Sequence, residues 1–162
     1  MSIPPVRRVI IALGVIGALL MPAGAGGGQT PWLGTWQLNP AKSTRRSDPS
    51  PYRRVTFRIE PAGDGVRVTY RMVGTRGGLT RMEWTGRFDG ADNPVQGVDS
   101  VLTNAYRQID DRSYEIVVKV DGQVAAVATT RVSSDGRTLT VTTAERAPRG
   151  QTVTTTAVYE RQ

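Results

Sequence analysis

The stretch "RRVTFRIEPAGDGVRVTYRM", residues 53–72, decides the fold of this chain. Apolar residues alternate with arginine and threonine on both sides of the turn sequence "PAGDG". The apolar positions are Val55, Phe57, Ile59, Val66, Val68, Tyr70 and Met72. Successive side chains of a β-strand point to opposite faces, so this pattern gives each strand one apolar and one polar face. The stretch therefore predicts two antiparallel strands with one face buried.

The same alternation continues along most of the chain. Met82, Trp84 and Phe88 alternate with polar residues after the turn sequence "GTRGG", and Asp121-Gly122 predicts a tight hairpin. Further strands are expected over residues 33–38, 101–109, 114–120, 124–132, 139–143 and 153–159, and loops over 39–51 and 89–97. No segment after residue 30 shows the 3.6-residue period of a helix.

These elements define the expected fold class. About nine strands joined by short turns predict an all-β, antiparallel up-and-down meander. A meander of this length leaves two exposed strand edges, and closure into a barrel removes them. We therefore predict a single β-barrel domain over residues 26–162.

Residues 1–25 have the layout of a secretory signal peptide. Arg7 and Arg8 precede an apolar run of thirteen residues, 9–21, and Ala23-Gly24-Ala25 supplies the small residues before a cleavage site. A membrane anchor is the alternative, but a helix that spans a bilayer needs about 20 apolar residues. We therefore expect an exported protein, periplasmic or secreted, with a mature chain of 137 residues that begins at Gly26.

The basic charge of the chain lies mainly in its first half. Removing Arg7 and Arg8 leaves 19 of the 21 basic residues against 14 acidic ones, a net charge of +5. Residues 26–90 carry 11 basic and 5 acidic side chains, whereas residues 91–162 carry 8 and 9. Six arginines fall on the predicted polar face of the early strands: Arg54, Arg58, Arg67, Arg71, Arg81 and Arg87.

If those strands are neighbours, the six arginines form one basic surface. Such a surface fits anionic envelope lipid or another polyanion, and an ordinary solvated face is the alternative. Nucleic acid is not expected as a partner, because aromatic residues do not interleave with these arginines and the protein is expected to be exported.

The sequence "LGTWQLN", residues 33–39, resembles the Gly-x-Trp opening of the lipocalins and the "GTW" start of fatty-acid-binding proteins. The pieces "NPAKS", "FDGADNPVQG", "VSSDGRTLTVT" and "VYERQ" are similar to a group of secreted bacterial lipocalin-like proteins of unassigned activity. The resemblance implies a lipocalin-like barrel whose base is closed by Trp36, with Gly34 before it and Arg161 across its indole. A cation over an indole contributes about 0.5–2 kcal/mol.

The chain also departs from the better-known lipocalins. It has no Thr-Asp-Tyr motif and no cysteine to form a disulfide, and it is short for an animal lipocalin. The ligands of those members are therefore not carried over to this chain.

The absence of histidine and cysteine excludes many kinds of active site. It removes Ser-His-Asp and Cys-His nucleophiles, and metal and haem sites built on those residues. Asp89 with Asp92 and Asp110 with Asp111 are the remaining carboxylate pairs, but aspartate is favoured in turns for its local backbone hydrogen bonds. The "DGADN" oxygens could bind calcium, but the loop lacks EF-hand spacing. We expect no enzyme, catalytic residue, metal or cofactor.

Two functions from different classes remain open. In the first, the barrel holds a small apolar or amphipathic molecule, unless side chains fill its interior as they do in many small barrels. The candidate lining residues are Phe57, Val68, Tyr70, Met72, Met82, Trp84 and Phe88. In the second, the arginine-rich outer face binds an anionic partner. The late strands are rich in threonine, which is expected mainly on the outside; any inward threonine would make the cavity partly polar.

Overall fold

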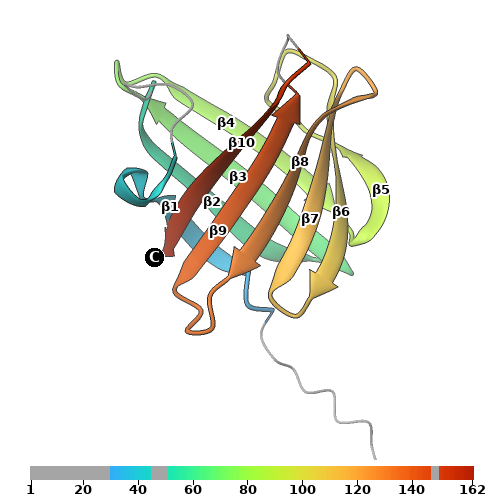
Figure 1. Ribbon diagram of the computed structural model, residues 1–162, viewed down its shortest axis with the longest axis horizontal. Helices are drawn as coiled ribbons and strands as arrows, with labels where there is room; N and C mark the ends of the chain where they lie inside the picture. Colours follow the sequence, from blue (N-terminus) through green and yellow to red (C-terminus); the bar gives the residue numbers. More distant parts are fainter. Residues whose placement is uncertain (1–29, 45–50, 147–149) are drawn as a thin grey trace, which may run out of the picture.

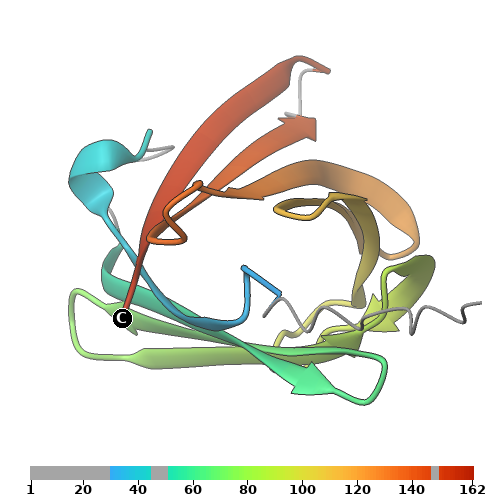
Figure 2. The same cartoon turned by 90° about the horizontal axis from the view of Figure 1, so that it is seen from below.

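The computed structural model describes residues 30–44, 51–146 and 150–162. Within these residues, ten antiparallel strands form one sheet in the order β4-β3-β2-β1-β10-β9-β8-β7-β6-β5. Apart from β4 and β5, which lie at the two ends of this order, strands that follow one another in the chain pair side by side, and β1 also pairs with β10. The strands run at a slant around a common axis (Figure 1), and the view along that axis shows them arranged in a ring (Figure 2). The predicted all-β up-and-down barrel is confirmed.

The strands have the following bounds. They are β1 Gly34–Leu38, β2 Tyr52–Ala62, β3 Gly65–Gly74, β4 Leu79–Gly86, β5 Asp89–Pro94, β6 Leu102–Asp110, β7 Ser113–Val120, β8 Gln123–Val132, β9 Thr138–Arg146 and β10 Thr152–Arg161. The hairpin predicted at Asp121-Gly122 is confirmed, because Val120 pairs with Gln123 and both turn residues have positive φ angles of 49° and 76°.

Two elements lie in segments that were predicted as loops. The strand β5 pairs with β6 through a bulge between Asp89 and Asp92, so its residues follow no regular alternation. A short 3-10 turn, η1 (Pro40–Lys42), follows β1, and the Asn39 side chain caps it by accepting hydrogen bonds from two backbone amides. Proline favours the first helical position, so a local cap and a proline explain this turn without any apolar period.

The apolar residues of the alternating pattern face the interior of the barrel. On β2, Val55, Phe57 and Ile59 are buried while Arg54 and Arg58 are exposed. The buried residues of the other strands join them in one hydrophobic cluster that runs through the barrel. The residues predicted to form the buried face of the early strands are therefore the ones that are buried.

The barrel is nearly closed between β4 and the segment after β5. Glu83 and Gln96 exchange two backbone hydrogen bonds of 3.1 and 2.8 Å across this junction. Gly97 follows with a φ of 87°, and a Cβ at this position would lie 2.1 Å from the Arg81 carbonyl oxygen. Only glycine lets these two segments of the chain approach each other this closely, so Gly97 helps to close the barrel.

A helix that crosses a membrane must be long and apolar. Within the described ranges, no helix is long and apolar enough to cross a membrane. The expected signal peptide, residues 1–25, lies outside the described residues.

Candidate functional site

One end of the barrel is covered by the residues that precede and begin β1. Trp36 is completely buried, and its Nε1 donates a hydrogen bond of 2.9 Å to the carbonyl oxygen of Trp32. Trp32 is itself 2% exposed and packs against Phe88 and Tyr114, with ring centroids 5.5 and 5.2 Å apart. Two tryptophans therefore occupy this end of the interior, where the sequence indicated one.

Arg161 lies over the indole of Trp36, as the resemblance implied. Its guanidinium carbon is 4.2 Å from the ring centroid, and the side chain also donates hydrogen bonds to the carbonyl oxygens of Gly136, Leu33 and Pro31. Gly34 has a φ of 129°, and a Cβ there would lie 2.6 Å from Nη1 of Arg161. The three residues of the barrel-base motif thus come together and tie the start of β1 to the end of β10.

Three of the candidate lining residues form a stack on the inner face. The Phe57 and Tyr70 rings are 4.9 Å apart at an interplanar angle of 14°, and Tyr70 and Trp84 are 5.7 Å apart at 16°. The three rings come from neighbouring strands β2, β3 and β4, because Phe57 pairs with Tyr70 across one ladder. Cross-strand aromatic pairs stabilise a sheet, so this stack also holds the wall of the barrel together.

The other candidate lining residues are also inside the barrel. Val68 is buried, and the partly buried Met72, Met82 and Phe88 pack against the hydrophobic cluster. All seven candidates therefore lie on the inner side of β2, β3, β4 or directly after β4.

A group of tyrosine hydroxyls lies in the interior, which the sequence analysis did not predict. Burial raises the pKa values of Tyr70, Tyr106, Tyr114 and Tyr159 above the usual range, and electrostatic repulsion by neighbouring tyrosines raises those of Tyr70, Tyr106 and Tyr114 further. The Tyr106 hydroxyl accepts a hydrogen bond of 2.5 Å from Trp84 Nε1. The hairpin of β6 and β7 and the distant strands β3 and β10 thus bring neutral hydroxyls into the core.

The strands β8, β9 and β10 line the interior with small residues. The register places Ala128, Thr143 and Thr155 side by side, and the neighbouring row contains Val141 and Ala157. Apart from the buried Ala128, these residues are half-buried, although they share the inner face with the fully buried Leu139 and Tyr159. Inward side chains that remain partly exposed border open space, and small ones leave more of it.

Some threonines of the late strands point inward and others outward. Thr130 is 1% exposed and Thr143 is half-buried, whereas Thr129, Thr142 and Thr154 are exposed. The interior is therefore partly polar on this side.

The carboxylates considered for catalysis make turn and surface contacts. Asp89 accepts a hydrogen bond from the Ala91 amide, and Asp92 forms an ion pair of 2.8 Å with Lys119. The Arg112 amide donates 2.8 Å to Asp110, and this bond lowers the pKa of that carboxyl. In the described part of the chain, no three histidine, cysteine, aspartate or glutamate residues are grouped as they would be around a metal ion.

All six arginines of the predicted basic face are exposed on the outer side of the sheet. Three are paired with acidic residues: Arg58 with Glu60, Arg81 with Glu83 and Arg87 with Asp64, at 3.1, 2.6 and 2.8 Å. The surface is therefore basic in patches and is not uniformly positive.

Comparison with known proteins adds no assignment to this geometry. The sequence matches no protein-family model and no curated protein.

Proposed function

We propose that this protein binds a small apolar or amphipathic molecule inside its barrel, as an exported protein of lipocalin-like type. The observation that carries the proposal is the set of small inward residues on β8, β9 and β10, represented by Ala128, Thr143 and Thr155. A barrel filled by its own side chains needs large residues on every wall. Here large residues occupy β2, β3 and β4, whereas β8, β9 and β10 carry small inward residues at these positions beside the large Leu139 and Tyr159.

The chemistry of the interior fits such a ligand. Tyr70, Met72 and Met82 present partly buried aromatic and flexible apolar surface, and methionine adapts to the shape of a bound molecule. Among the described residues no arginine or lysine is buried, whereas tyrosine hydroxyls lie in the interior, so a bound molecule meets neutral hydroxyls. A mostly apolar molecule with one uncharged polar group suits this lining best.

Native mass spectrometry of the protein purified from its own host tests the proposal. We expect a species heavier than the polypeptide by the mass of one small molecule, and loss of that mass under denaturing conditions. The same protein mixed with a total lipid extract of the host serves as a second sample. If both samples show only the mass of the polypeptide, the proposal is wrong.

A further inference from the structure

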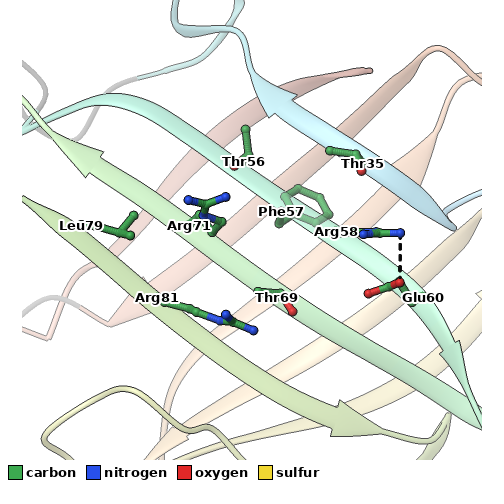
Figure 3. Close-up of a pocket in the computed structure, with 9 residues that line it drawn as sticks. All are labelled: Thr35, Thr56, Phe57, Arg58, Glu60, Thr69, Arg71, Leu79 and Arg81. Carbon is green, nitrogen blue, oxygen red and sulfur yellow. Dashed lines mark ion pairs between the residues drawn. The ribbon is translucent and has the colours of Figure 1, made fainter.

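A groove of about 590 Å³ crosses the outer face of the sheet formed by β1 to β4. Figure 3 shows the groove residues on these four neighbouring strands, with arginines from three of them. The residues that line it are Thr35, Thr56, Phe57, Arg58, Glu60, Thr69, Arg71, Leu79 and Arg81. Phe57 belongs to both this groove and the inner face, where it stacks on Tyr70, whereas the arginines of the groove are exposed on the outer face.

Two arginines occupy directly paired positions of neighbouring strands in this groove. The register pairs Arg71 on β3 with Arg81 on β4. Like charges directly opposite one another destabilise a sheet, so folding alone gives no reason for this pair. An anion between the two guanidinium groups would turn the repulsion into attraction.

Within the part of the chain that the structure describes, the charges around the pair leave Arg71 without a carboxylate partner. Arg81 is paired with Glu83, which also accepts a hydrogen bond of 3.3 Å from Thr69, and Arg58 is paired with Glu60. Among the described residues Arg71 forms no ion pair. Arg71 is therefore the arginine of this groove that is left to meet an anion.

We propose that this groove binds a phosphate group through Arg71 and Arg81, with the phosphate either free or part of a lipid headgroup. Guanidinium groups bind phosphate oxygens through pairs of parallel hydrogen bonds, and a tetrahedral anion can accept bonds from two strands at once. The hydroxyl of Thr56 lies in the same groove as a further donor, while that of Thr69 donates to Glu83. Leu79, 57% exposed at the groove, offers apolar contact to whatever carries the phosphate.

The first test is a titration of the full chain with inorganic phosphate, followed by amide chemical shifts. We expect saturable shifts around Arg71 and Arg81, weakened about tenfold or more by Arg71→Gln because a charge-assisted bond is lost. Arg87→Gln is the matched control: Arg87 is an exposed arginine close to the end of β4, is paired with Asp64 and lies outside the groove. It should leave the affinity within about twofold of wild type.

The second arm uses vesicles of phosphatidylcholine with and without phosphatidylglycerol. Binding only to the phosphatidylglycerol vesicles, lost in Arg71→Gln and kept in Arg87→Gln, identifies a lipid headgroup as the source, even without a response to free phosphate. A response to free phosphate alone identifies a soluble phosphate compound. No response in either arm, or equal loss in the two variants, overturns the proposal.

A stability measurement separates loss of the site from loss of the fold. Arg71→Gln removes a like-charge contact, so its melting temperature without phosphate should equal or exceed that of the wild type. A variant that melts lower than wild type without phosphate would mean that Arg71 has a structural role, which would also overturn the proposal.

Discussion

Trp36 and Arg161 show how single residues hold the base of the barrel. The tryptophan supplies the buried surface, and the arginine covers its ring while donating hydrogen bonds to two backbone carbonyls before β1 and to one in the turn between β8 and β9. Arginine suits this position because its planar group can stack on an indole and donate in several directions at once. The pair joins residues 125 positions apart, since Arg161 follows Trp36 by that number in the chain.

A double-mutant cycle measures this arrangement. Trp36→Ala should destabilise the protein by about 3–5 kcal/mol, as truncation of a buried aromatic residue does. Arg161→Ala should cost about 1–3 kcal/mol, from the cation–π contact and the lost hydrogen bonds. The coupling between them should be about 0.5–2 kcal/mol, and part of the Arg161 effect should persist without Trp36, because its hydrogen bonds go to the backbone. Urea unfolding of the four variants gives these values, and strict additivity would contradict the stacked geometry.

At the scale of strands, the tyrosine hydroxyls connect walls of the barrel that are distant in sequence. Tyr70 belongs to β3, Tyr106 to β6, Tyr114 to β7 and Tyr159 to β10, and burial is the first cause of the raised pKa of each. Ionising any of them inside the barrel would place a charge in the core without a cation beside it. The folded state therefore keeps these four protons to a higher pH than the unfolded chain does.

This difference predicts unfolding in alkaline solution. Unfolded tyrosines lose their protons near pH 10, while the four buried ones keep theirs, so the stabilising contribution is complete below that pH and is lost above it. Stability should fall by about 1.4 kcal/mol per pH unit for each of the four residues, and Tyr159→Phe should reduce that slope by one residue's share. Urea midpoints at a series of pH values measure the loss of stability, and phenolate absorbance measures the ionisation of the tyrosines. Smooth ionisation of these rings in a protein that stays folded would contradict their buried placement.

The strands could be predicted because their cause is local. Phe57, Val68 and Trp84 each sit in an alternating run, and alternation alone determines which face of a strand is buried. β5 was missed because its polar residues and its bulge remove that alternation. The turn η1 was missed because a cap and a proline form it without an apolar pattern.

The site was only partly predictable because it depends on which strands become neighbours. The contact of Arg161 with Trp36 was expected from a resemblance, and nothing in the residues between them indicates it. Tyr106, Tyr114 and Tyr159 occupy the apolar phase of their own strands, so their burial could have been read from the sequence. Their convergence could not, because the pairing of β1 with β10 brings the two halves of the barrel together.

At the scale of the whole molecule, three groups of residues form the interior of the barrel. Trp32 and Trp36 cover one end, the aromatic stack and the tyrosine hydroxyls follow, and small residues such as Thr143 line the wall formed by β8, β9 and β10. The outer face carries the separate groove around Arg71. Substitutions at Thr143, inside the barrel, and at Arg71, on its outer face, therefore test the interior and the groove separately.

The measurement that tests the central claim most directly is a titration with a hydrophobic fluorescent dye that compares wild type, Thr143→Trp and Thr142→Trp. Thr143 faces the interior from β9, and the adjacent Thr142 is exposed on the outer face, so the two tryptophans differ only in the side they occupy. Wild type and Thr142→Trp should take up one dye per chain, little changed by added salt, and Thr143→Trp should bind about tenfold or more weakly because it fills the space. Equal dye binding by all three proteins, or binding that salt abolishes, would contradict a ligand-holding interior.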